Sequence, residues 1–336
     1  MHMRGFSLIE VMIAMVLGLI VAGAAVALFS TSRMTYTVSE NMGRIQEANR
    51  TAFDLMSRDI RDAGGNPCDN TSTNYTMSTG LNSPTSHWWS DWGSGMVGYA
   101  STTAFSDSAF GTSAGQRVSG TDAIELKGGD VIDTAWVTTA NTSASSNISV
   151  KSVADVVTGD LLILCDYYGG TIFQVTGFSG NTIKHANTGT PGNTSGSLVK
   201  VQATGPLDSS GNEPPLVSTN ASISRLRATR WYIGCNGRVA CSQPGGRSLY
   251  QSSLKNTAGT LSVATNEIAS GASGMTLQYL TNGATAYVAA GSVSDWSKVT
   301  AVKIDITFSG QDKVGTNGSA VTRVVEQVVS LRNHTT

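Results

Sequence analysis

The chain has 336 residues, a formal net charge of −1 at pH 7 and only 13% charged residues. This length can bury a sizeable core, and the balanced charge gives no strong field that would favour nucleic acid, so no direct nucleic-acid binding is expected. Globular proteins average about 25% charged residues. Glycine, serine, threonine and asparagine fill the deficit here, which is typical of strands joined by many turns.

An uninterrupted apolar segment runs from Val11 to Phe29 without a charged or strongly polar side chain. Its length matches the roughly 20 apolar residues that span a bilayer core. A secretory signal peptide has a shorter apolar core and then a small-residue cleavage site, whereas this segment runs on into a helical pattern. Because Arg4 precedes it, the positive-inside rule predicts a single-pass protein with residues 1–5 in the cytoplasm and the bulk outside.

Glu10 is a carboxylate at the start of this apolar segment. A charge at the centre of a membrane helix costs about 2.5–3.5 kcal/mol on insertion scales, and less near an end. The segment offers no evident partner, since Arg4 lies off the faces that i, i+3 and i, i+4 neighbours share. Cleavage between Gly5 and Phe6 would create an α-amino cation one turn away, in the same helix or in a staggered neighbour. The carboxylate would then act as an assembly signal.

The stretch RGFSLIEVMIA at residues 4–14 resembles the N-terminal motif of type IV prepilins. The resemblance implies that a membrane-bound prepilin peptidase cuts after Gly5 and that Phe6 becomes the N-methylated first residue. It also implies that Glu10 is the assembly carboxylate. The alternative is a generic signal anchor whose glutamate is incidental.

Beyond Phe29, apolar residues recur at steps of three and four, which predicts one face of a helix. They are Val38, Met42, Ile45, Ala48, Ala52, Leu55, Met56 and Ile60. No proline interrupts residues 6–62, and GGNP at 64–67 ends the pattern, so we expect one helix about 85 Å long. Gly18 and Gly23 indicate either a segment that extends in a filament or close helix packing, and we favour packing.

Short β-like runs separated by Gly- and Asn-containing turns follow position 120. They cover residues 123–126, 135–138, 148–153, 161–164, 171–175, 198–202, 223–233, 275–280, 286–289, 299–308 and 321–331. The predicted fold class is therefore α+β, with a long N-terminal helix packed on an antiparallel sheet or on two packed sheets. Together with this prediction, the resemblance of the N-terminus to type IV prepilins implies a type IV pilin-like fold.

Several segments resemble the PilW family of minor pilins. They are RDIRDAG at 58–64 with Cys68, GDLLILCD at 159–166, RWYIG at 230–234, residues 299–308, and VSLRN at 329–333. The expected division is a leader at 1–5, a transmembrane or filament-core helix at 6–30, an amphipathic spine at 31–64 and a β-rich periplasmic or extracellular domain at 65–336. The length of the chain favours a minor subunit over a major pilin.

The chain has four cysteines, all on the predicted outer side: Cys68, Cys165, Cys235 and Cys241. An even number in an oxidising compartment indicates two disulfides. The short loop CNGRVAC favours Cys235–Cys241, which leaves Cys68 with Cys165. A zinc site is the alternative, but no C-x-x-C occurs and no histidine is near a cysteine in sequence, so no metal is expected.

Other signals of chemistry are weak. GTSAG at 111–115 fits G-x-S-x-G but lacks a preceding apolar strand, so chance explains it. Asp208–Glu213 has oxygen ligands in a turn and is either a weak calcium site or, as we favour, a solvated turn. Trp88, Trp89 and Trp92 form either a docking surface or a small satellite core, and we favour the core. We expect no enzyme activity and no cofactor.

The sequence thus predicts a minor type IV pilin that takes part in initiation of the pilus or in its tip complex. The resemblance implies as partners the prepilin peptidase, an inner-membrane assembly platform, other minor and major pilins, and a tip adhesin. It also implies roles in twitching motility, adhesion or DNA uptake. The protein would reside in the inner membrane before assembly and in the pilus afterwards. The alternatives are a minor pseudopilin of a type II secretion system and a membrane-anchored periplasmic enzyme or binding protein.

Overall fold

A computed structural model describes residues 7–64, 76–141, 143, 145–166, 169–198 and 217–332. Its longest element is α1 (Leu8–Arg61), one helix of 54 residues, about 81 Å long at 1.5 Å per residue. The predicted continuity of this helix is confirmed. The Asp62 N–H donates to the Arg58 carbonyl at 3.2 Å, and Gly64 follows in the left-handed region at a φ of 68°. A glycine therefore ends the helix where the sequence predicts a breaker.

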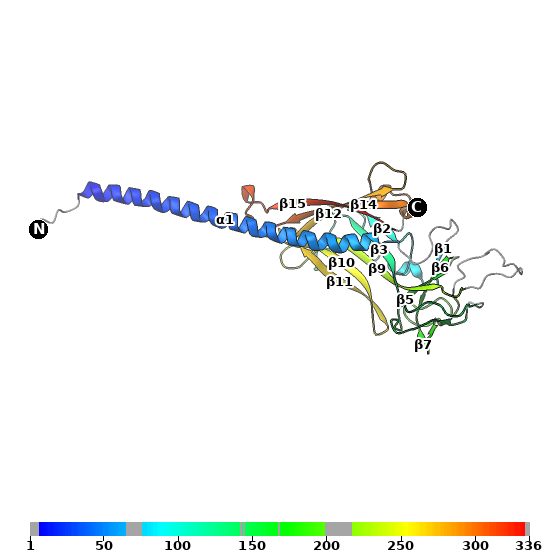
Figure 1. Ribbon diagram of the computed structural model, residues 1–336. Coiled ribbons are helices and arrows are strands. Elements are labelled where there is room, and N and C mark those ends of the chain that lie inside the picture. Colours follow the sequence, from blue (N-terminus) through cyan, green and yellow to red (C-terminus); the bar gives the residue numbers. More distant parts are fainter. Residues whose placement is uncertain are drawn as a thin grey trace.

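The described residues after α1 form three sheets, whose longer strands can be followed in Figure 1. The largest has eight strands: six run in the order β1-β6-β5-β9-β10-β11, β3 also pairs with β9, and β2 pairs with β3. The bounds are β1 (Thr76–Thr79), β2 (Met96–Tyr99), β3 (Ala123–Val131), β5 (Leu161–Asp166), β6 (Gly169–Gln174), β9 (Ser222–Cys235), β10 (Arg247–Thr257) and β11 (Thr260–Ser270). We call this the large sheet.

The second sheet has four strands in the order β13-β12-β14-β15, and the third has three in the order β4-β8-β7. Their bounds are β12 (Ala272–Thr281), β13 (Val288–Ala289), β14 (Val299–Ser309), β15 (Thr322–Ser330), β4 (Ile148–Ser149), β7 (Gly177–Ser179) and β8 (Thr182–Lys184). Short 3-10 helices occur at η1 (Pro84–Ser86), η2 (Ala290–Ser292), η3 (Trp296–Lys298) and η4 (Thr316–Gly318). The prediction of strands laid against a helix is confirmed.

The second half of α1 lies between the two larger sheets. It contacts β11, the last strand of the large sheet, and β14 and β15 of the four-stranded sheet. In Figure 1 the helix runs along the domain between the β14–β15 pair and the β10–β11 pair. Ile45, Phe53, Met56 and Ile60 enter one core with residues of both sheets. The helix is thus a structural part of the domain, since it fills the space between two sheets.

The buried face of α1 differs from the predicted one at two large residues. Leu55 is 37% exposed, whereas Phe53 is only 7% exposed and lies in the core. Successive helical residues are about 100° apart, so Leu55 lies about 100° from Met56 and Phe53 only about 60° from it. Leu55 is three residues from Ala52 but points to the edge of the apolar face, whereas Phe53 points into it.

A buried carboxylate joins α1 to the large sheet. Asp59 is 8% exposed, and its Oδ2 accepts from Trp231 Nε1 at 2.9 Å and from Gln251 Nε2 at 2.8 Å. Trp231 is itself fully buried. These bonds connect the helix to β9 and β10 and satisfy the indole donor, which a buried tryptophan requires.

The three-stranded sheet belongs to a segment between β3 and β9 that has its own apolar cluster. Ile148, Phe173, Ile183 and Ile223 are among its buried residues. Figure 1 places β7 at the end of the domain far from the N-terminus. This cluster gives the far end of the domain a core separate from the one around α1.

Some predicted strands differ from the observed ones. Residues 135–138 form only an isolated bridge, Val137 to Val150, and 199–202 of the expected 198–202 run lie outside the described residues. β1 pairs with β6 in parallel, so the large sheet is not wholly antiparallel.

The β10–β11 hairpin was missed by the sequence patterns. Its two-residue turn is Ala258–Gly259, with φ of 50° and 91°. Such turns usually carry Asn-Gly or Asp-Gly, and the alanine hides the signal. Both strands are also rich in polar residues, which hides the apolar alternation, although β10 is mostly buried or half-buried and only β11 is largely exposed.

Candidate functional site

The start of α1 is capped by a reciprocal pair of hydrogen bonds. Glu10 N–H donates to Ser7 Oγ at 3.2 Å, and the Ser7 N–H donates to Glu10 Oε2 at 3.0 Å. This is a capping box, and it satisfies two N–H groups that a helix start otherwise leaves unpaired. The carboxylate also favours the positive end of the helix dipole. Glu10 therefore has a partner within its own segment, which the sequence analysis overlooked.

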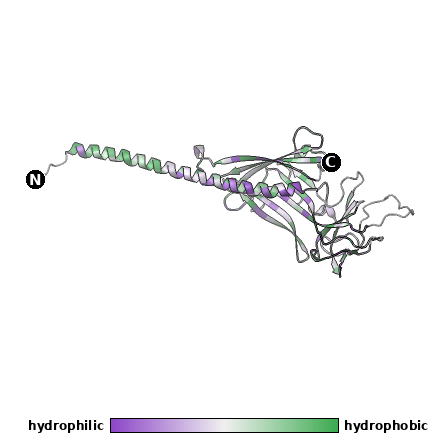
Figure 2. Ribbon diagram, in the orientation of Figure 1, coloured by the Kyte–Doolittle hydropathy of each residue, from purple (hydrophilic) through white to green (hydrophobic). Residues whose placement is uncertain are grey.

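The apolar half of α1 projects from the domain. Figure 2 shows it as a nearly continuous hydrophobic rod, and the half beside the sheets as mixed. Leu19 is 73% exposed, Ile20 62% and Leu28 71%. Of the described helices, α1 alone is long and apolar enough to cross a membrane, and that span buries none of its surface in the domain. Apolar surface on this scale needs a lipid or protein environment.

Threonines mark the change from the apolar half to the spine. Thr31, Thr35 and Thr37 donate their hydroxyls to carbonyls four residues earlier, at 2.9, 3.0 and 3.1 Å. A hydroxyl satisfied inside its own helix is cheaper to remove from water than a free one. The hydroxyls in this segment therefore suit either side of a membrane boundary.

The cysteines behave as structural residues. Cys235 and Cys241 form a disulfide with a Cα–Cα distance of 5.2 Å, the pair that the short loop favours. Cys165 is also disulfide-bonded, and its predicted partner Cys68 lies outside the described residues. No described cysteine is free.

The tryptophans of residues 88–92 pack inside the domain, so the prediction of a satellite core is confirmed. Trp88 is 8% exposed and Trp89 7% exposed, and Trp92 packs against the same cluster. The cluster joins them to β5, β6 and β9, for example at Ile163. They do not form an exposed docking surface.

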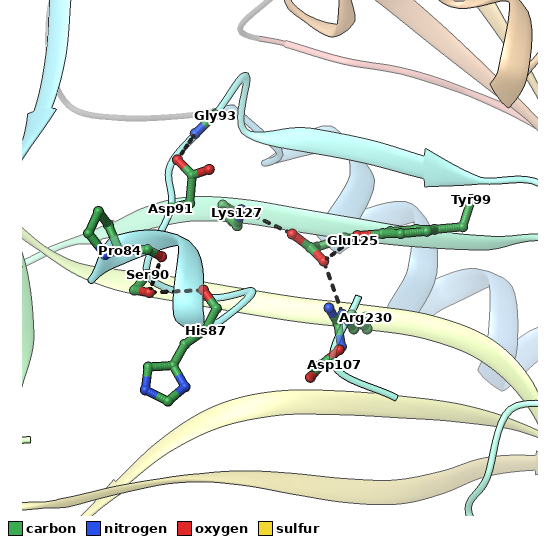
Figure 3. Close-up of polar contacts among 10 residues, drawn as sticks. All are labelled: Pro84, His87, Ser90, Asp91, Gly93, Tyr99, Asp107, Glu125, Lys127 and Arg230. Carbon is green, nitrogen blue, oxygen red and sulfur yellow. Dashed lines mark hydrogen bonds and ion pairs between the residues drawn. The ribbon is translucent and has the colours of Figure 1, made fainter. Parts of the chain in front are cut away.

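A buried group of charged residues lies on the face of the large sheet that is turned away from α1. The carboxylate of Glu125 on β3 binds Arg230 Nε and Lys127 Nζ, both at 3.0 Å, and Arg230 Nη1 binds Asp107 at 2.7 Å (Figure 3). Glu125, Lys127 and Arg230 are at most 6% exposed. Burial, and then the Glu125 charge, raise the pKa of the adjacent Tyr99 to about 12. The sequence patterns missed this group because its members are brought together only by strand pairing. The only signal in the sequence was that Glu125 and Arg230 are charged residues within predicted β-like runs, with Lys127 directly after the first of these runs.

Several predicted site residues cannot be placed. Gly5, Phe6 and Asp208–Glu213 lie outside the described residues. Among the described residues, no group of three His, Cys, Asp or Glu side chains could hold a metal ion. The G-x-S-x-G segment lies in a loop, where Ser113 N–H donates to the Gln116 side chain at 3.0 Å.

Comparison with known proteins adds one finding. Residues 1–26 match the model of the prokaryotic N-terminal methylation motif. The match supports a type IV pilin-like prepilin, and the long helix packed on antiparallel-rich sheets is consistent with an α+β type IV pilin-like fold. No curated protein and no solved structure matches the chain. The motif thus indicates processing by a prepilin peptidase, assembly with other pilins and membrane anchoring, and it identifies no finer family.

Proposed function

We propose that this protein is a minor type IV pilin that helps to initiate the pilus or forms part of its tip complex. The observation that carries the proposal is the projecting apolar half of α1, with Glu10 in its first turn and the methylation motif over the same residues. The large domain and the PilW-like segments support the minor role. Downstream roles in twitching, adhesion or DNA uptake are those of the pilus as a whole.

Assembly would move the apolar half of α1 from lipid into a bundle of like helices. Lipid and packed helices are similarly apolar, so the transfer depends on packing and on the few polar groups. Glu10 is the principal polar group in this segment. Its bond to the Ser7 N–H offsets part of its burial cost before assembly, and the α-amino group of Phe6 in a neighbouring subunit would supply a stronger, charge-assisted partner afterwards.

The same geometry serves a minor pseudopilin of a type II secretion system, since the motif does not separate the two. A third possibility is a periplasmic enzyme or binding protein with an uncleaved anchor. We propose a mechanical role without catalysis, which is supported by the loop position of the G-x-S-x-G segment away from a strand–turn–helix elbow.

Mass spectrometry of the N-terminal peptide from native membranes tests processing first. We expect a chain that starts at methylated Phe6 and lacks residues 1–5. A chain that keeps residues 1–5 would overturn the filament proposal in favour of the anchored periplasmic protein.

Incorporation into filaments tests the role of Glu10. We expect Glu10→Gln to remain in the membrane but to disappear from sheared filaments. The control is Glu47→Gln, an exposed glutamate on the same helix, which we expect in filaments at the wild-type level. Wild-type protein absent from sheared pili but required for protein secretion would identify the pseudopilin alternative.

A further inference from the structure

A cavity of about 370 Å³ lies where the large sheet meets the four-stranded sheet. Arg247, the first residue of β10, lines it from the large sheet. Ser273 on β12, Ser309 at the end of β14 and Thr322 at the start of β15 line it from the four-stranded sheet. The loop at 241–245 forms a further wall. Ligand pockets usually measure about 300–1,000 Å³, so this cavity can hold a small ligand.

The guanidinium of Arg247 is held at the cavity by two backbone carbonyls. Nε donates to the Cys241 carbonyl and Nη1 donates to the Ser273 carbonyl, both at 3.1 Å. The disulfide to Cys235 on β9 holds Cys241, and with it the first of these carbonyls, beside the large sheet. Because the two acceptors belong to different walls, they fix the guanidinium before a ligand arrives, which lowers the entropic cost of binding.

The third nitrogen of this guanidinium is open. Nη2 of Arg247 has no hydrogen-bond partner among the described residues, whose acceptors bind only Nε and Nη1. Nη2 of Arg230 also lacks a partner but is buried, whereas Arg247 is only half-buried and its Nη2 keeps accessible surface. A ligand in the cavity can therefore reach this nitrogen of Arg247.

Arg247 also lacks a counter-charge. The arginines before it on β9 and in the following loop each form an ion pair: Arg225 with Asp160, Arg227 with Asp62, Arg230 with Glu125 and Arg238 with Glu267. Arg247 is in no ion pair of the described residues, and none of the described lining residues is acidic. Asp312, in a neighbouring loop, accepts from Asn41 at 3.2 Å. The described walls thus carry one unbalanced positive charge.

Other polar groups of the lining are available to a ligand. Ser242, Gln243 and Thr322 are exposed, and their side chains form no hydrogen bond to a described residue. The backbone N–H groups of Ser242 and Gly245 likewise have no described acceptor. Hydroxyl, amide and backbone N–H donors around one arginine are the groups that proteins use to bind phosphate.

We propose that this cavity binds a phosphate group, with Nη2 of Arg247 as the charged donor. Arginine binds a planar carboxylate best through two parallel N–H donors, and Nε of Arg247 is already used. Donors on separate walls suit the tetrahedral oxygens of phosphate. The volume equals roughly twelve water molecules at about 30 Å³ each, so it has room for a phosphate ester of the size of glycerol 3-phosphate. The site goes beyond the filament role and does not depend on it.

Isothermal titration calorimetry of the full-length chain, in micelles of an uncharged detergent without phosphate, tests the proposal. The probes are glycerol 3-phosphate, inorganic phosphate and glycerol. We expect glycerol 3-phosphate to bind at least about tenfold more tightly than glycerol, because only the phosphate supplies an acceptor with charge for Arg247. Tighter binding of the ester than of inorganic phosphate would support an ester as the ligand, and the reverse would support the free ion. The proposal is overturned if neither phosphate binds more tightly than glycerol.

Matched variants test the location of the site. Thr322 and Thr260 are both exposed threonines at the first position of a strand, and of the two only Thr322 lines the cavity. We expect Thr322→Glu to weaken binding of glycerol 3-phosphate at least about tenfold, because its carboxylate would repel the phosphate and compete for Arg247. Thr260→Glu should bind as wild type. Equal binding by the two variants would overturn the location.

Arg247→Gln is a second probe, which removes the positive charge and keeps an amide donor. Its urea unfolding is compared with that of wild type first, because Arg247 also bonds to two carbonyls of the fold. We expect the folded variant to lose at least about tenfold in affinity for glycerol 3-phosphate. A folded Arg247→Gln protein that binds this ester as tightly as wild type would also overturn the proposal.

Discussion

The two halves of α1 share one uninterrupted helix and meet opposite surroundings. The apolar half carries Leu19 and Leu28 at over 70% exposure, whereas the half beside the sheets buries Phe53 and Met56. The apolar half is apolar on every side, and the other half has one apolar face with charges elsewhere. A helix that is apolar all round is suited to lipid or to a bundle, and an amphipathic helix is suited to the surface of a domain. The sequence pattern alone thus separates the part that assembles from the part that folds.

Each half of α1 also contains a hydrogen-bonded carboxylate, and the partners of the two carboxylates differ. Among the described residues, the Glu10 carboxylate accepts from the Ser7 N–H within its own first turn, while Asp59 accepts from Trp231 and Gln251 on two strands. Glu10 can exchange its partner without disturbing the fold, whereas Asp59 cannot. This difference predicts that Glu10 matters for assembly and Asp59 for stability.

Truncation of a core residue should give the largest effect. Phe53→Ala removes a ring from between the helix and the sheets, and we expect a loss of about 3–5 kcal/mol in the free energy of unfolding. Urea unfolding of the full chain in detergent, followed by tryptophan fluorescence, measures it. Leu28→Ala is the control, and we expect an unchanged midpoint because Leu28 touches no part of the domain. Equal losses in both variants would contradict the division of α1 into two halves.

An aspartate introduced into each half of α1 tests whether the apolar half, and not the spine, spans the membrane. Ile20→Asp should weaken membrane insertion by about 2.5–3.5 kcal/mol, because the carboxylate would lie near the middle of the span. Leu55→Asp adds the same charge to the outer side of the spine, where we expect no change in membrane retention. Membrane fractionation with alkaline extraction measures the retained share. Full retention of the Ile20→Asp protein would show that the apolar half does not span the bilayer.

Removal of Asp59 should have the next largest effect. Asp59→Ala leaves the donors of Trp231 and Gln251 without their acceptor, and each buried unpaired group costs about 1–3 kcal/mol. We expect a lower urea midpoint and altered tryptophan emission, since Trp231 loses its indole bond. Glu10→Ala should leave the midpoint unchanged. A stable Asp59→Ala protein would show that water replaces the carboxylate.

The sequence predicts the helix well because its pattern is local. Periodicity and the breakers at 64–67 suffice to predict its length. The N-terminal motif suffices to identify Glu10 as a candidate site residue. The capping box is equally local, since a serine three residues before a glutamate is its sequence signature, and Ser7 and Glu10 have this spacing.

The sheet was harder to predict because its stabilising contacts are not local. The β10–β11 hairpin turns at Ala258 and carries polar residues on its exposed side, so neither turn type nor alternation identifies it. The partners Glu125 and Arg230 are 105 positions apart, and only the pairing of β3 with β9 brings them together. No pattern within a single segment reveals that cluster, because its members meet only through strand pairing.

Removal of an exposed ion pair should have the smallest effect on stability. It provides a comparison with the buried carboxylate of Asp59. Glu267 on β11 binds Arg238 Nη1 at 3.0 Å and accepts from Ser248 Oγ at 2.7 Å. Burial alone would raise the pKa of Glu267, but the bonds from Arg238 and Ser248 hold it below its ordinary value. The pair is half open to water, so we expect Glu267→Gln to cost less than about 1 kcal/mol at neutral pH.

Because the pKa of Glu267 is lower in the folded state, the stabilisation is fully present above its unfolded pKa of about 4.3 and is lost as the pH falls through the folded pKa. The difference in urea midpoint between wild type and Glu267→Gln should therefore shrink in acid and in high salt. A difference that persists below about pH 3 would show that Glu267 acts through packing or through its neutral hydrogen bonds rather than through its charge. Asp59 should differ in this respect: most of its effect should survive high salt, because its two close partners, Trp231 and Gln251, are neutral donors in the core, and its one cation, Arg227, lies 3.9 Å away.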